Sequence, residues 1–140
     1  MHDGIIDAND LYHYYAGAYL RLINAYRFNP DAALRSCSWG KFQILGGNFG
    51  LCGERNIKDF ADKMCTSEAS QIKLVAQFIR NKPRTWKNAK NKTLGKEISL
   101  WDAVKTKNWA AIAFNYNGPH HKNYDIKLKA AYEKCNAKKV

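Results

Sequence analysis

Two segments of this 140-residue sequence combine glycine, aromatic and amide residues, and neither has the spacing of a simple helix face. They are residues 36–46, Ser-Cys-Ser-Trp-Gly-Lys-Phe-Gln-Ile-Leu-Gly, and residues 113–119, Ala-Phe-Asn-Tyr-Asn-Gly-Pro. This combination suits carbohydrate binding, because sugar rings lay their C–H faces on aromatic rings and sugar hydroxyls pair with amides that both donate and accept. Glycines let backbone N–H and C=O groups approach a ligand closely.

Each segment also has a purely structural explanation. Trp39, Phe42 and Ile44 can be core residues, and Gln43 can be an amide that ties a loop. An Asn-Gly pair that follows Tyr116 is common where a helix ends. Composition by itself favours these structural roles over sugar binding.

The elements that must position these segments are predicted to be helices, since apolar residues recur at spacings of three and four and no stretch alternates with period two. Helices are expected over residues 11–27, 31–38, 57–65, 68–81, 99–106, 109–117 and 124–135. Asn9 and Asp10 are expected to cap the first helix, and the glycine-rich residues 39–53 are expected to form loops or short turns. The fold class is therefore all-α or mostly α.

Within residues 68–81, the spacing of the apolar residues predicts which face is buried. The expected buried residues are Ile72, Val75, Ala76 and Ile79. Residues 82–96 carry six Lys or Arg and no acid, so they are predicted to be a basic surface loop.

Composition bounds the class of protein. The 46% apolar content supports one compact domain over residues 1–140 that buries roughly 68% of its unfolded surface, and we expect a monomer. The net charge of +11 favours anionic partners such as nucleic acid, an anionic membrane or a cell-wall polymer. The sequence has no apolar run of membrane-spanning length and its start lacks signal-peptide features, so we expect cytoplasmic synthesis.

The four cysteines, Cys37, Cys52, Cys65 and Cys135, form no C-x-x-C pair and no metal-ligand spacing with the histidines. We therefore expect free thiols, with no disulfide, metal or organic cofactor.

The order of the two glycine–aromatic–amide segments is informative. Residues 33–46 and, about seventy residues later, residues 108–119 closely resemble the phage-type N-acetylmuramidase family of the lysozyme-like superfamily. The resemblance extends through residues 60–64, 67–71 and 124–132, and it covers most of residues 15–135. It implies a lysozyme-like helical domain of the kind found in phage endolysins, which are cell-wall-degrading glycoside hydrolases.

The resemblance also implies roles for particular residues. Gly40-Lys41-Phe42-Gln43 is similar to the segment whose Gln lines the glycan cleft, and Tyr116-Asn117-Gly118 is similar to the segment whose Tyr lies near the catalytic acid. The predicted substrate-binding residues are accordingly Trp39, Gln43, Tyr116 and Asn117. The implied substrate is the glycan strand of peptidoglycan, cut at the β-1,4 bond between N-acetylmuramic acid and N-acetylglucosamine. A basic protein made in the cytoplasm would act on the anionic wall once it is released.

The sequence departs from the family pattern in its acids. Glycoside cleavage needs a carboxylic acid that keeps its proton near neutral pH, and the family's Glu precedes the Trp-Gly-x-Phe-Gln segment. No Glu precedes Gln43 here, so the chain resembles an N-terminally truncated muramidase domain whose catalytic residue is unknown. Glu54 is the remaining candidate acid, although a surface or cap role is expected for it.

Two other functions stay open at this point. The chain can be a catalytically silent cell-wall-binding module or a degenerate prophage remnant that keeps the sugar groove. It can also be a small basic nucleic-acid-binding protein, although the sequence has no helix-turn-helix or comparable signature.

Overall fold

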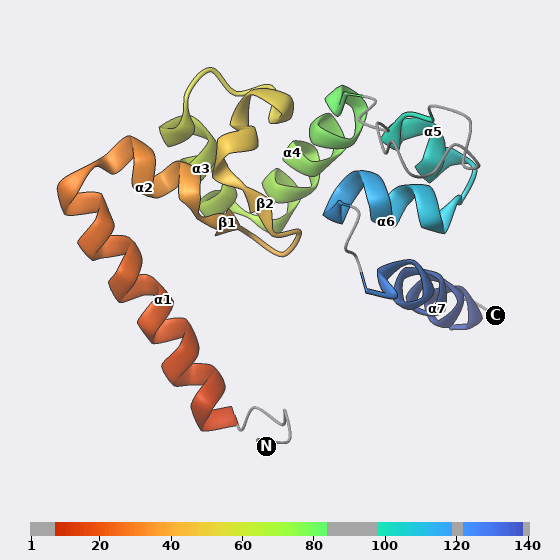
Figure 1. Cartoon of the computed structure of the whole chain (residues 1–140), viewed down its shortest axis with the longest axis horizontal. Helices are drawn as coiled ribbons and strands as arrows, with labels where there is room; N and C mark the ends of the chain where they lie inside the picture. The colour runs from red at the N-terminus through yellow and green to blue at the C-terminus, as the bar shows by residue number, and fades with distance from the viewer. Residues whose placement is uncertain (1–7, 84–97, 119–121, 139–140) are drawn as a thin grey trace. The chain divides into compact units, whose positions relative to one another are not determined.

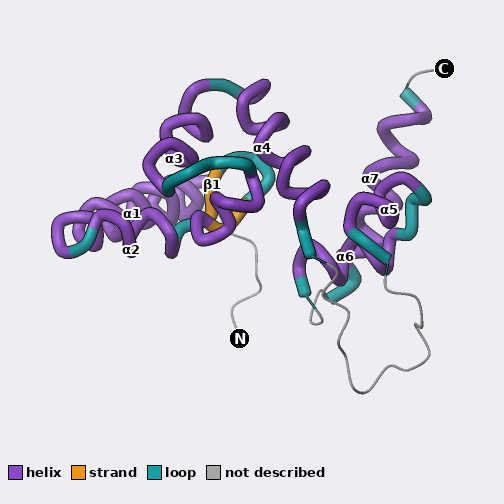
Figure 2. Tube along the Cα trace, turned by 90° about the horizontal axis from the view of Figure 1, so that it is seen from above, coloured by secondary structure: helices purple, strands orange, loops and turns teal. Residues whose placement is uncertain are grey.

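The computed structural model describes residues 8–83, 98–118 and 122–138, and the chain divides into two compact units, Met1–Phe78 and Ile79–Val140 (Figure 1). Helices dominate the described residues, which confirms the predicted fold class (Figure 2). In chain order the elements are α1 (Ala8–Phe28), α2 (Pro30–Ser36), β1 (Ser38–Trp39), β2 (Ile44–Leu45), the 3-10 helix η1 (Gly46–Cys52), α3 (Ile57–Thr66), α4 (Glu68–Asn81), α5 (Leu100–Lys105), α6 (Trp109–Asn117) and α7 (Tyr124–Ala137).

Local side-chain caps explain where four of these helices begin. The Asn29 side chain accepts a hydrogen bond from the Ala32 N–H, 3.0 Å away, at the start of α2. Equivalent bonds are accepted by Asn56 for α3, Ser99 for α5 and Asn108 for α6. A capping side chain satisfies an N–H group that has no partner inside the helix, so these short polar residues fix the helix starts.

The start of the first helix differs from the expectation. Asn9 and Asp10 were expected to cap it, but α1 begins at Ala8, so both residues lie within its first turn. The helix therefore extends further toward the N-terminus than the apolar residues from which its start at residue 11 was predicted.

Unit 1 has a core of large apolar side chains from α3, α4 and the residues around the β-hairpin. Phe60 is fully buried, and Met64 and Phe78 are each 3% exposed. The other buried apolar residues of the unit are Ala33, Ile44, Cys52, Ile57, Ala61, Leu74 and Val75.

The predicted buried face of α4 was wrong apart from Val75. The buried residues are Leu74, Val75 and Phe78, whereas Ile72 is 50% exposed. Ala76 is also exposed and Ile79 is half-buried. Two apolar stripes with helical spacing coexist on this helix, and the stripe that carries the Phe78 ring is the one that is buried.

α1 extends away from the rest of unit 1 and contacts it through α2 (Figure 1). Its last turns expose Tyr19, Leu20 and Phe28, which are 69%, 61% and 92% exposed. Residues 17–28 of this helix therefore add little buried apolar surface to the unit.

Unit 2 is built from α5, α6 and α7, with α6 in contact with each of the other two. Its buried apolar residues are Leu100, Ala103, Ala111 and Ala113. α7 has no buried residue, and its Tyr132 ring lies 5.2 Å from the ring of Trp109, measured between centroids. Among its described residues, this unit therefore buries one leucine together with small side chains.

Several sequence predictions fall on other parts of the chain. Most of the predicted basic loop, residues 84–96, lies outside the described residues. So do Glu97, which the sequence favours as a solvated partner of nearby lysines, and His120 and His121, which it favours as part of a solvated helix start. The single domain over residues 1–140 stays a prediction. In the described ranges, no helix is long and apolar enough to cross a membrane.

Candidate functional site

The first predicted segment folds into a short antiparallel hairpin, which the sequence analysis placed among loops and turns. Ser38 pairs with Leu45, and Trp39 pairs with Ile44. Two-residue strands are too short to show alternation, so the pattern of the sequence could not reveal them. The hairpin presents its turn, residues 40–43, at the end of the two strands.

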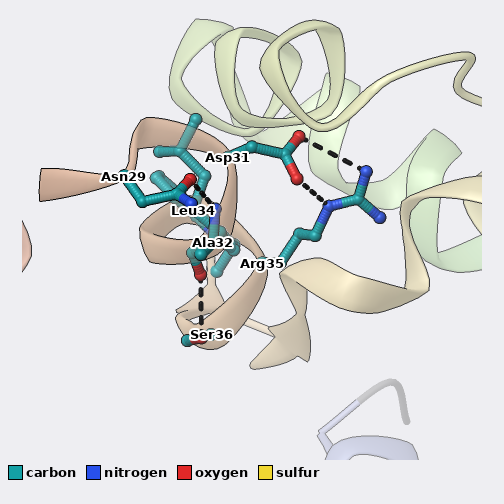
Figure 3. A network of polar contacts seen from close by, with 7 residues as sticks. Asn29, Asp31, Ala32, Leu34, Arg35 and Ser36 are labelled. Atoms are coloured by element: carbon teal, nitrogen blue, oxygen red, sulfur yellow. Dashed lines mark hydrogen bonds and ion pairs between the residues drawn. The ribbon is translucent and has the colours of Figure 1, made fainter. Parts of the chain in front are cut away.

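The Trp39 side chain fixes one strand of the hairpin to α2. This half-buried indole donates from Nε1 to the Leu34 carbonyl oxygen over 2.9 Å. α2 is itself ordered by the Asn29 cap, by the ion pair between Arg35 and Asp31, and by the bond from Ser36 Oγ to the Ala32 oxygen (Figure 3). Trp39 is therefore an anchor as well as a candidate for sugar stacking.

Gly46 holds the second strand against the same helix. A Cβ atom at this position would lie 2.1 Å from the Leu34 carbonyl oxygen, closer than any side chain can come. The Gly46 N–H donates to the Cys37 carbonyl oxygen over 2.7 Å. This close approach of two backbones requires glycine.

Gln71 of α4 fixes the turn of the hairpin from the other side, and the sequence analysis did not select it as a site residue. Its Oε1 accepts from the Lys41 N–H at 3.0 Å, while its Nε2 donates to the Met64 carbonyl oxygen at 2.8 Å. A Cβ on Gly40, whose φ is +68°, would lie 2.8 Å from Gln71 Oε1. The signal was available, because Gln71 ends one of the segments that resemble the family.

Gln43 occupies an unusual backbone conformation at the end of this turn. Its φ is +52°, in the left-handed region that disfavours side chains with a Cβ. The side chain is exposed, and its Nε2 donates to the Gly40 carbonyl oxygen over 3.0 Å. No described residue donates to its Oε1. Gln43 therefore presents a positioned amide with an acceptor and a second N–H available to a ligand.

The second predicted segment forms the end of α6. Tyr116 is half-buried, and Asn117 is exposed as the last residue of the helix. Gly118, with a φ of +83°, ends the helix by donating from its N–H to the Phe114 carbonyl oxygen over 2.8 Å. The local geometry matches the helix-end explanation, and the substrate contacts of Tyr116 and Asn117 stay predictions.

Asn115, in the same segment, has a structural role that the sequence did not reveal. It is 3% exposed, and its Nδ2 donates to the Ala111 carbonyl oxygen over 2.9 Å. Its Oδ1 has no hydrogen-bond partner among the described residues. An unpaired buried acceptor is costly, so this side chain contributes less to stability than its burial suggests.

The four predicted binding residues fall into two pairs. Trp39 and Gln43 belong to one hairpin in unit 1, and Tyr116 and Asn117 belong to α6 in unit 2. A groove shared by both pairs stays a prediction.

Glu54, the candidate stand-in acid, does not have the expected surface or cap role. Its side chain is only 9% exposed, and both carboxylate oxygens accept from Lys63 Nζ, at 2.7 and 2.8 Å. The left-handed Gly53, with a φ of +84°, turns the chain so that Glu54 meets α3. Both carboxylate oxygens are thus engaged by an ammonium group of the chain itself, whereas a general acid must be free to reach the leaving oxygen of a substrate.

The described residues give no indication of a metal or disulfide site. All four cysteines are free, and no group of three or more His, Cys, Asp or Glu side chains in the described part of the chain is placed to hold a metal ion. Burial raises the pKa of the Cys52 thiol to about 11, with a smaller contribution from the nearby Glu54 charge.

Comparison with known proteins identifies the family. The family model for N-acetylmuramidase matches residues 2–136. The crystal structure of the Burkholderia AP3 phage endolysin is similar at a TM-score of 0.65 and 30% identity, over 87% of this chain and 42% of that chain. The chain thus spans less than half the length of that endolysin, and no curated protein matches it. With its helical, lysozyme-like fold and its Trp-Gly-x-Phe-Gln hairpin, the chain belongs to the N-acetylmuramidase family.

Proposed function

We propose that this chain binds the glycan strands of peptidoglycan, with the hairpin around Gln43 as part of the contact surface. The observation that carries the proposal is the exposed Gln43 amide in a left-handed backbone conformation. Membership of the N-acetylmuramidase family supports this substrate class. A net charge of +11 adds long-range attraction to an anionic wall.

Gln43 is one of four described residues other than glycine with a left-handed φ, and it is the one that lies in the Trp-Gly-x-Phe-Gln segment. A left-handed φ at a residue other than glycine costs on the order of 1 kcal/mol, and such residues cluster at ligand sites. Glycine would remove the cost but would also remove the amide. An amide can donate to and accept from an N-acetyl group or a sugar hydroxyl, so its retention fits an aminosugar ligand.

The family reaction cuts the β-1,4 bond between N-acetylmuramic acid and N-acetylglucosamine, and it requires a proton donor. Among the described carboxylates, Glu54 is paired with Lys63, Glu68 with Lys41 and Asp31 with Arg35. Each of these three carboxylates is thus engaged by a cation of the chain itself. The proposal is therefore binding to the wall, and a turbidity measurement tests for cleavage.

Sedimentation with purified peptidoglycan sacculi tests the proposal. The chain should pellet with the sacculi, and Gln43→Ala should weaken this binding about fivefold, because one neutral hydrogen bond to a ligand is worth about 1 kcal/mol. Asn24→Ala, which removes an exposed amide from α1, is the matched control and should bind like the wild type.

Two results would contradict the proposal. One is equal binding by the wild type and Gln43→Ala. The other is competition by DNA, with affinity falling steeply with salt, which would favour a nucleic-acid-binding protein. Turbidity measured on the same sacculi separates binding from cleavage: clearing by the wild type would show that a further carboxylate donates the proton.

A further inference from the structure

Unit 1 contains a hollow of about 500 Å³ that shares no residue with the hairpin site. It lies among the residues that follow η1, the C-terminal end of α3 and the first three turns of α4. The lining residues are Cys52, Glu54, Lys63, Thr66, Ser67, Ala69, Ser70, Lys73, Leu74 and Gln77.

One wall of the hollow is electrically neutral. Glu54 and Lys63 neutralise one another through contacts of 2.7 and 2.8 Å. The neighbouring Cys52 is 2% exposed, and because burial raises the pKa of its thiol to about 11, that thiol is uncharged near neutral pH. This wall offers apolar surface and a fixed ion pair, and it carries no net charge.

The opposite wall, on α4, is a row of hydrogen-bond donors. Ser70, Lys73 and Gln77 are spaced three and four residues apart, so they lie along one face of the helix and all line the hollow. No described acid pairs with the Lys73 ammonium, and no described residue bonds the Gln77 amide. Lys73 therefore gives the hollow a net positive charge, next to a neutral amide and a hydroxyl.

We propose that this hollow binds the carboxylate end of a short peptide with small aliphatic side chains. The Lys73 ammonium would form an ion pair with the carboxylate. Gln77 and Ser70 would form hydrogen bonds with the N–H and C=O groups of the peptide. The exposed Ala69 offers apolar contact to an aliphatic side chain. Pockets for small organic ligands span about 300–1,000 Å³, so this volume suits a peptide of a few residues better than a single inorganic ion.

A carboxylate fits this lining better than a phosphate group does. Phosphate sites typically use the planar fork of Arg or several cations, whereas the hollow has one unpaired Lys and no Arg. The natural source of such a peptide would be the short peptides that branch from peptidoglycan glycan strands. This source rests on the proposed function, whereas the binding chemistry of the hollow does not.

The test is a titration of the whole chain with the synthetic tetrapeptide tetra-alanine, whose only carboxylate is its C-terminus, followed by amide chemical shifts and calorimetry. Shifts are expected at Ser70, Lys73 and Gln77. The C-terminal carboxamide of the same peptide should bind about tenfold more weakly, because it lacks the charge that Lys73 recognises. This comparison uses the wild-type protein and needs no folded variant.

Lys73→Gln should also weaken binding of the free peptide about tenfold. Lys58→Gln removes the same charge from an exposed residue of α3 outside the hollow, and it should change the affinity less than twofold. Equal losses in both variants, shifts elsewhere, or full displacement of the peptide by an equal concentration of acetate would overturn the proposal.

Glycan strands stripped of their peptides separate this inference from the proposed function. Stripped strands that bind while the tetrapeptide does not would overturn only the peptide site. A tetrapeptide that binds while stripped strands do not would support the peptide site and contradict glycan binding.

Discussion

The two units of this chain bury different kinds of side chain. Unit 1 buries Phe60, Met64 and Phe78, while the largest buried side chain among the described residues of unit 2 is Leu100, accompanied by alanines. Buried apolar area contributes about 25 cal/mol per Å², so the large side chains provide most of the hydrophobic stabilisation. The comparison teaches that the described core of unit 1, which holds the strained Gln43, rests on aromatic and long side chains, whereas the described core of unit 2 rests on one leucine and small side chains.

The largest expected effect tests the core of unit 1. Phe60→Ala removes a fully buried ring and should lower the free energy of unfolding by about 3–5 kcal/mol. Phe28→Ala is the matched control, because Phe28 is 92% exposed and its loss should change stability by less than about 0.5 kcal/mol. Urea denaturation gives both values, and a similar loss in the two variants would refute the assigned core.

Leu100→Ala makes the corresponding test in unit 2. Leu100 is fully buried, so its truncation should cost about 2–4 kcal/mol, and we expect the amides of α5 and α6 to lose protection from hydrogen exchange. The control is Val104→Ala on the exposed side of α5. If the α5 and α6 amides of Leu100→Ala kept their full protection from hydrogen exchange, Leu100 would not be needed to hold these two helices together.

Cys52 gives unit 1 a stability that depends on pH. Its thiol has a folded-state pKa of about 11 against the ordinary 9.0, so above pH 9 the unfolded chain loses this proton first. The stabilisation is therefore complete below pH 9 and falls as the pH rises through 11, by up to about 2 kcal/mol. Unfolding of the wild type and Cys52→Ala should be compared at pH 8 and pH 11. An unchanged difference between them at the two pH values would count against burial of this thiol.

The smallest expected effect concerns the buried amide of unit 2. Asn115→Leu replaces a side chain whose Oδ1 has no described partner with an apolar group of similar size. The free energy of unfolding should change by less than about 1 kcal/mol, in contrast to the other buried positions. Thermal unfolding measures this change, and a loss above about 2 kcal/mol would show that Asn115 pairs with a group that stabilises the unit.

The helices could be predicted from the sequence because their signals are local. Apolar spacing and short polar caps such as Asn56 and Ser99 depend on residues three or four positions apart. The buried face of α4 could not be predicted in this way, since two apolar stripes coexist there and only packing against other elements selects between them. The β-hairpin was missed because its strands have two residues each.

In the candidate site, too, residues that depend on their sequence neighbours could be predicted, whereas contacts between residues far apart in the sequence could not. Gln43 could be selected from its neighbours in the Trp-Gly-x-Phe-Gln segment. The bond from the Lys41 N–H to Gln71 joins residues thirty positions apart, and no local pattern predicts it. The ion pair of Glu54 with Lys63 also depends on how Gly53 turns the chain, so the burial of that acid could be found only from the structure.

The exposed thiols Cys65 and Cys135 lie one in each unit. Thiol-reactive dyes attach where a cysteine is accessible, so Cys65 and Cys135 could carry the donor dye and the acceptor dye of an energy-transfer measurement. Replacing the half-exposed Cys37 with Ser would leave one fast-reacting position in each unit, because the buried Cys52 reacts slowly. Such a doubly labelled protein would report directly how the distance between the two units responds when peptidoglycan fragments are added.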